Sequence, residues 1–479
     1  MEILLFLESH FNDIIILKKL VRYKGAFMKT EKSFARELWA IMLPVALQSL
    51  LSSLVSASDA LMLGLLDQSS LSAISLAAQV AFVLSLFHMA FTTGASVLAA
   101  QYWGMHDKDI VERVLGISLK ISLPVSAGFA ALALFAPGLL MRVFTSDATL
   151  IQMAIPYLRI VSVSYLLTGF TQMYLNIMKN SGRVAQSSLY GSVTVVSNIL
   201  LNLLLIFGWL GLPALGIRGA ALATVISRVI ELALCLWENR KVGEVCFKTE
   251  TFLHTDRVLA KDYWRYTTPV FLNFLVWGGG ITMFSVIMGH LGSDAVAANS
   301  ITNIVKNLLL SFCTGVGAGS GIMIGNRLGA GKLEEARSAG NKLLAAALIC
   351  GTAVGCVLLV LVPCSSVFSR SLTEQAGGYL KIMLVISSYA VLGKSINSTL
   401  VSGVFTAGGD TQFGFYCDLI TMWCIIIPLS AFAAFAMKWP VPVVYFLLNL
   451  DEIGKIPVVI RHFRKYKWVK NLTGKEQST

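Results

Sequence analysis

The chain has 479 residues, of which 56% are hydrophobic and only 13% are charged. Soluble domains carry about 25% charged residues, so this composition excludes an ordinary soluble fold and indicates a membrane protein. The net charge of +12 does not indicate nucleic-acid binding. Most lysines and arginines fall in segments that we place on one side of a membrane, as the positive-inside rule describes.

Residues 1–35 are predicted to form a cytoplasmic N-terminal extension. Its apolar patch is interrupted by acidic residues and is followed by no small-residue cleavage site, so we expect no signal peptide. The extension forms either a surface helix or an upstream start artefact, because Met28 begins a plausible shorter chain. We expect a chain that begins at Met28 to insert and transport normally.

Apolar stretches long enough to cross a bilayer recur along the rest of the chain. We predict an all-α membrane protein with about twelve transmembrane helices. The stretches lie near residues 39–66, 70–103, 109–140, 148–178, 184–209, 217–239, 263–290, 294–326, 335–366, 373–405, 411–437 and 440–462.

Asp59 is the most informative residue of the first predicted helix. A charged side chain at membrane depth costs from about 3 to over 10 kcal/mol, so such a residue usually faces a cavity and marks an ion or substrate path. Burial raises the pKa of a carboxyl group, which suits binding of a proton, and Na⁺ is equally possible at Asp59. The alternative is a structural hydrogen bond to another helix.

The two halves of the chain repeat each other at a nearly constant offset. Pro44 and Pro269 are 225 residues apart, as are Gly104 and Gly329. Six helices per repeat give both halves the same orientation, which predicts parallel repeats. We therefore predict an N-lobe (36–239, helices 1–6), a cytoplasmic linker (240–262), a C-lobe (263–466, helices 7–12) and a cytoplasmic tail (467–479).

The C-lobe contains its own set of intramembrane polar residues. Two interpretations are open: the set binds substrate or ions, or it is a buried ion-pair network that fixes helix packing. Trp277 and Trp423 lie in the middle of helices, where an aromatic face beside acids suits an organic cation and core packing is the alternative. The charged members are Lys306, Lys394, Asp418, Asp451 and Glu452.

The order of several short motifs resembles that of the multidrug and toxic compound extrusion (MATE) transporters. These are Pro44 with Asp59, AAQYWG at 99–104, NILLN at 198–202, LGIRGAALATVIS at 215–227, PVFLNFLVWGGG from Pro269, GNRLGAGKLEEA at 325–336 and AGGDTQFGFYCDLITMW from Ala407. The resemblance implies a secondary antiporter that exports organic, often cationic, drugs or metabolites in exchange for H⁺ or Na⁺. It implies no cofactor other than this coupling ion.

The resemblance also implies a cation site in the N-lobe, formed by Asp59 with Asn198, Asn202 and Thr224. Asn198 and Asn202 are four residues apart and share one helical face; joining helices is the alternative role for both. The C-lobe departs from the family pattern. The position of the helix 7 acid holds Trp277 or Phe274, and the helix 10 acid aligns near Ser395.

Other function classes find less support. No HExxH, Walker or GxSxG motif is present, so we predict that the protein is not an enzyme. A lipid-linked glycan flippase of the same superfamily is the closest alternative, because intramembrane lysines would suit its basic cavity, and an ion channel is a more distant one. We expect a monomer in the cell membrane with both termini cytoplasmic. Its partners are a small-molecule substrate and membrane lipid.

Overall fold

The computed structural model describes residues 34–55, 58, 62, 68–211, 213–241, 245–253, 256–365 and 372–474. Asp59 and almost all of the predicted N-terminal extension lie outside these residues. Within them, eleven helices are long and apolar enough to cross a membrane. The chain is an all-helical, multi-pass membrane protein, as predicted.

The first half begins with the helix Phe34–Val55. Asp side chains accept hydrogen bonds from the first turns of two of the helices that follow: Asp107 caps α3 and Asp147 caps α5. The remaining elements are α2 (Gln68–Gly104), α3 (Lys108–Phe135), α4 (Pro137–Arg142), α5 (Ala148–Asn180), α6 (Val184–Phe207), the 3₁₀ turn η1 (Trp209–Gly211), α7 (Ile217–Glu238) and α8 (Thr249–Leu253).

The second half repeats this succession of long helices. Three of its segments, η2, η3 and η4, are π-helical and continue neighbouring α-helices. The elements are α9 (Arg257–His290), α10 (Ser293–Gly329), α11 (Leu333–Leu361), α13 (Glu374–Asn397), η2 (Ser398–Phe405), α14 (Thr411–Asp418), η3 (Leu419–Ile426), α15 (Ile427–Ala431), η4 (Phe432–Ala436), α16 (Val441–Gly454) and α17 (Ile456–Phe463).

The twelfth predicted span, 440–462, differs from the prediction because it is interrupted. The chain forms α16 to Gly454 and then a second helix, α17, from Ile456. Pro457 stands in the first turn of α17, where a proline lacks the N–H that a continuous helix would need. The interruption leaves Lys455 between two short helices.

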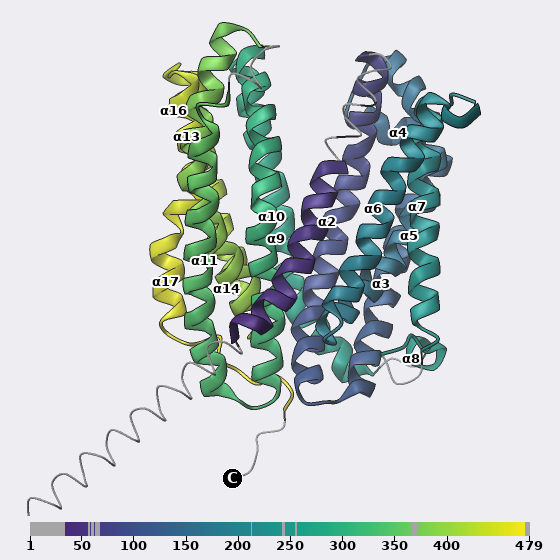
Figure 1. Cartoon of the computed structure of the whole chain (residues 1–479), viewed down its shortest axis with the longest axis vertical. Helices are drawn as coiled ribbons and strands as arrows, with labels where there is room; N and C mark the ends of the chain where they lie inside the picture. Colours follow the sequence, from purple (N-terminus) through teal and green to yellow (C-terminus); the bar gives the residue numbers. More distant parts are fainter. Residues whose placement is uncertain are drawn as a thin grey trace, which may run out of the picture.

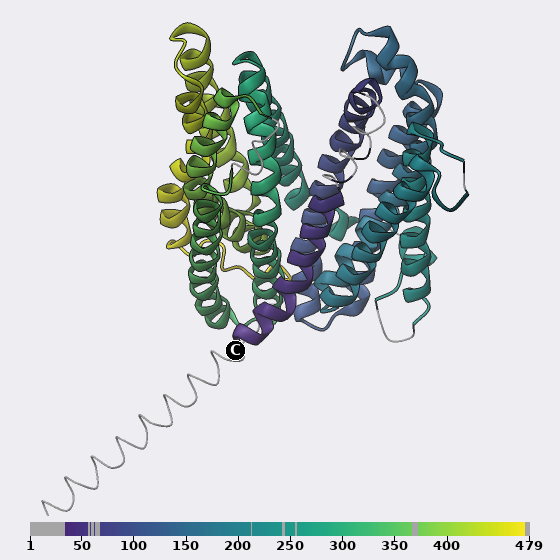
Figure 2. The same ribbon diagram turned by 45° about the horizontal axis from the view of Figure 1, so that its top comes forward.

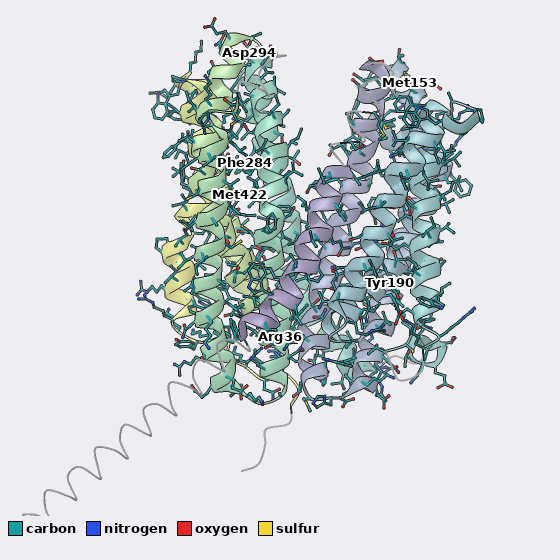
Figure 3. All side chains as sticks on the ribbon, in the orientation of Figure 1. Arg36, Met153, Tyr190, Phe284, Asp294 and Met422 are labelled. Atoms are coloured by element: carbon teal, nitrogen blue, oxygen red, sulfur yellow. The ribbon has the colours of Figure 1, made fainter. Side chains whose placement is uncertain are left out.

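The helices form two bundles, as Figure 1 shows. One bundle contains α2 to α7, and the other contains α9 to α17. The bundles approach each other at the end that carries α8 and diverge toward the opposite end, which the turned view of Figure 2 also shows. Arg36 lies at the converging end, whereas Met153 and Asp294 lie at the diverging end (Figure 3).

The leading helix of each half begins against the bundle of the other half. Leu38 and Met42, in the helix Phe34–Val55, belong to a buried cluster of the C-lobe. Glu37 pairs with Arg327 of α10 at 2.6 Å. Reciprocally, Tyr263 of α9 is fully buried in the main N-lobe cluster. The lobe boundaries near residues 36 and 263 stay predictions, and the packing shows that helices 1 and 7 contact both lobes.

The inter-lobe linker packs on the N-lobe. The carboxylate of Glu112, which is 1% exposed, pairs with Lys248 at 2.6 Å and accepts a hydrogen bond from Cys246 N at 3.1 Å. Phe247 packs edge-on against Phe170 of α5. The linker therefore forms part of the N-lobe surface at the converging end.

Candidate functional site

A cavity of about 410 Å³ lies between the two lobes. Its N-lobe wall is formed by α2 and α5 and includes Ser96, Asn176 and Lys179. Its C-lobe wall is formed mainly by α9, α10, η2 and α14. A cavity lined by both repeats is the arrangement expected for alternating access in a secondary transporter.

An ion-pair network occupies the C-lobe side of this cavity. Lys455 Nζ lies 2.7 Å from Asp418 Oδ1 and 2.7 Å from Asp451 Oδ2. Lys394 Nζ lies 2.8 Å from Glu452 Oε1. We call these five residues the C-lobe ion network. Its three carboxylates face two ammonium groups, so with every group ionised the network carries one excess negative charge.

Two further contacts complete the C-lobe ion network. Asn397 donates hydrogen bonds to both the backbone oxygen of Glu452 and its Oε2, at 2.7 and 2.9 Å. Asp451 is 3% exposed, and its Oδ1 has no hydrogen-bond partner among the described residues. A buried carboxylate oxygen without a partner is costly, which makes Asp451 the member best suited to accept a proton.

A second cavity of about 320 Å³ lies within the C-lobe. It shares Trp277, Lys394 and Glu452 with the central cavity. Asp451 and Lys306 line only the second cavity, whereas Asp418 and Lys455 line only the central one. The C-lobe ion network therefore stands between the two cavities.

The two tryptophans expected at the substrate cavity differ in position. Trp277 lines both cavities, and Lys394 Nζ lies 5.4 Å from the centre of its ring. Trp423 lines neither of the two cavities. Its indole N–H donates to the backbone oxygen of Val276 at 2.9 Å, and the side chain is 37% exposed. Trp423 therefore fastens η3 to α9, and its expected place in the cavity is corrected.

In the N-lobe, the structure brings Asn198 and Asn202 together. Asn202 Nδ2 lies 3.3 Å from Asn198 Oδ1, and both side chains are buried. Thr224 lies on the neighbouring helix α7, where its hydroxyl donates to Ala220 of the same helix at 3.0 Å. The fourth residue of the predicted cation site, Asp59, lies outside the described residues.

Met62, three positions after Asp59, is described and buried. It belongs to a cluster that also contains Ile206 and Ala220, with Ile199 and Leu203 packed against it. These residues are neighbours in sequence of Asn198, Asn202 and Thr224. The cluster joins the chain near Asp59 to the parts of α6 and α7 that hold the three polar residues.

The MatE family model matches the chain twice, at residues 44–204 and 269–432. The chain belongs to the MATE family of transporters. The two matches begin at Pro44 and Pro269, the same pair that defines the internal repeat. Membership confirms the expectation of a transporter rather than an enzyme.

Individual MATE-type relatives cover nearly the whole chain. YisQ of Bacillus subtilis, described as an uncharacterized transporter, is 22% identical over 94% of this chain and 98% of its own length. The probable multidrug resistance protein NorM of Thermotoga maritima is 23% identical over 91% of this chain and 93% of its own length. A crystal structure of a MATE protein in complex with MaL6 superposes with a TM-score of 0.82 at 19% identity, covering 90% of this chain and 96% of that one.

Two residues of the MATE cavity escaped prediction from the sequence. Lys455 follows Asp451 by four residues, a spacing that places both side chains on one helical face, so the pair was detectable. Lys179 follows no motif. It is the penultimate residue of α5, where a lysine usually marks only a cytoplasmic helix end, and only the folded structure shows that it lines the central cavity.

Proposed function

We propose that this MATE transporter is a secondary antiporter that exports organic compounds carrying a positive charge in exchange for H⁺ or Na⁺. The main support is the charge of the C-lobe ion network, which lines the central cavity with three carboxylates against two lysines. Trp277 adds an aromatic face at the same wall. An excess negative charge beside an aromatic ring is an environment that attracts an organic cation.

We propose that the coupling ion binds in the N-lobe, at Asp59 with Asn198, Asn202 and Thr224. The buried pair of asparagines and the cluster around Met62 support this assignment. Moving one charge across 100 mV yields about 2.3 kcal/mol, which sustains roughly a 40-fold substrate gradient. The C-lobe carboxylates are less suited to coupling, since lysines hold two of them ionised.

We propose that the protein lies in the cell membrane with the converging end of the bundles in the cytoplasm. The start of the helix Phe34–Val55, α8 and the C-terminal segment all lie at that end (Figure 1). The lobes then diverge toward the outside, which corresponds to an outward-facing form. A cysteine placed at Ser146, an exposed residue near the diverging end, should react with an impermeant reagent in intact cells. Labelling only after permeabilisation would reverse this orientation.

The alternative of a glycan flippase rests on lysines in the central cavity. Lys394 and Lys455 line it, but carboxylates neutralise both. Their pairing favours the drug antiporter. Efflux of organic cations from proteoliposomes under separately imposed Na⁺ and pH gradients tests the proposal. We expect one of the two gradients to drive efflux, and no efflux under either would contradict it.

A further inference from the structure

The N-lobe wall of the central cavity carries a lysine whose charge no carboxylate balances. Lys179 Nζ donates to Gln48 Oε1 at 2.9 Å. Among the described residues, no ion pair joins it to an acid. An ammonium group carries three protons, so the bond to Gln48 leaves two of them for the cavity.

Nearby acids are already engaged elsewhere. Glu231 of α7 is buried and pairs with Arg228 at 2.8 Å, while Thr171 donates to the same carboxylate at 2.9 Å. Asp410 lines the central cavity but contacts His462 at 2.6 Å. Leaving a partly buried ammonium without a counter-charge is costly, so Lys179 favours a ligand that brings a negative charge.

The surroundings of Lys179 are built to hold it in place. Gln48 lies against α6 at Gly191, where a Cβ atom would collide with its amide nitrogen. Beyond Lys179, Ser96 donates to Asn176 Oδ1 at 3.1 Å, and Asn180 donates to Ser96 at 2.9 Å. The ammonium is thus presented by an ordered polar wall rather than by a free surface chain.

The two walls of the cavity therefore have opposite polarity. The N-lobe wall presents Lys179, and the C-lobe wall presents the C-lobe ion network, with its excess negative charge, and Trp277. We propose that the central cavity binds amphoteric aromatic compounds, with a carboxylate at Lys179 and an amine or other cation at the C-lobe ion network. The inference rests on the proposed function in one respect, that this cavity is the substrate site.

A matched pair of dyes separates the two charges. Rhodamine B carries a cation and a carboxylate, whereas the ethyl ester of rhodamine B keeps only the cation. Binding of each dye to purified protein is measured by fluorescence polarisation for the wild type, Lys179→Met and Lys179→Arg. Lys120→Met is the matched control, because it removes a lysine of α3 that lines neither of the cavities described.

A charge-assisted hydrogen bond corresponds to about tenfold or more in affinity. Lys179→Met should weaken rhodamine B binding by about this factor and leave the ester unchanged, while Lys179→Arg and Lys120→Met should bind both dyes as the wild type does. The same loss for both dyes, no loss for either, or a wild type that binds neither would overturn the proposal. Selective binding without gradient-driven efflux would instead contradict the proposed antiport and leave the carboxylate subsite standing.

Discussion

Gly104 and Gly329, 225 residues apart in the sequence, make the same contact from opposite sides of the interface between the lobes. A Cβ atom on Gly104 would collide with the carbonyl group of Asn326, and one on Gly329 would collide with the carbonyl group of Gln101. The equivalent glycines of the two repeats thus let α2 and α10 approach to backbone contact at the converging end. This contact depends on the outward-facing arrangement of the lobes.

Replacement of Gly104 by valine should separate the lobes at this end. The added side chain meets backbone, which cannot rotate away, so the outward-facing form loses stability relative to other arrangements. A cysteine at Ala407, which is 4% exposed and accepts a hydrogen bond from Gln101, reports the separation. Its labelling in a background without native cysteines should become severalfold faster.

Gly128 provides the control for this experiment. It lies on α3, where a Cβ atom would meet nothing within 4 Å. Gly128→Val should leave the labelling of the Ala407 cysteine unchanged. Equal labelling of the Gly104 and Gly128 variants would show that the glycine contact does not hold the lobes together.

Lys455 should contribute more to stability than any single carboxylate of the C-lobe ion network. Lys455→Met leaves three carboxylates with one lysine, and breaking a buried pair in this way costs about 3–5 kcal/mol. Asp451→Asn leaves two carboxylates and two lysines, so we expect a smaller loss. Thermal unfolding of the detergent-purified variants measures the difference.

Lys306→Met is the matched control for Lys455→Met, because Lys306 lines the second cavity and is not part of the C-lobe ion network. We expect its melting temperature to stay near that of the wild type. The double variant Lys455→Met with Asp451→Asn should recover part of the lost stability. A Lys455→Met protein as stable as the wild type would mean that the network is not a buried ion-pair network.

Glu112 should hold the inter-lobe linker on the N-lobe. Glu112→Gln removes the charge that pairs with Lys248 and Lys108, so the linker should detach more often. Trypsin cleavage after Lys248 should then become faster, by severalfold. Glu334→Gln, which removes only an exposed pair with Arg337, should cleave at the wild-type rate. Unchanged cleavage of Glu112→Gln would place the attachment in the aromatic contacts of Phe247 instead.

The sequence predicted the architecture well because the membrane restricts it. Long apolar stretches, the repeat from Pro44 to Pro269 and the polar linker follow from bilayer thickness and backbone hydrogen bonding. The interruption at Lys455 was missed, although Gly454 and Pro457 both indicate it. An apolar stretch of the right length was read as one continuous helix.

The site was less predictable because it depends on contacts between distant helices. The sequence indicated that Lys394, Asp418, Asp451 and Glu452 form one polar set, but it did not indicate which lysine pairs with which acid. Trp423 was expected at the cavity because it lies mid-helix, and the structure shows it against α9. The reciprocal packing of Tyr263 and Leu38 in opposite lobes leaves no local signal, since each looks like an ordinary core residue.

Gradient-driven efflux by Asp59→Asn tests the central claim most directly. Wild-type and variant proteins are reconstituted into liposomes, and efflux of an organic cation is followed under a pH gradient and, separately, a Na⁺ gradient. Asp451→Asn is measured in parallel as the C-lobe comparison. We predict that Asp59→Asn folds, binds substrate and shows no gradient-driven efflux, while Asp451→Asn retains it. Normal efflux by Asp59→Asn, together with a stable but inactive Asp451→Asn, would place coupling in the C-lobe and contradict this account.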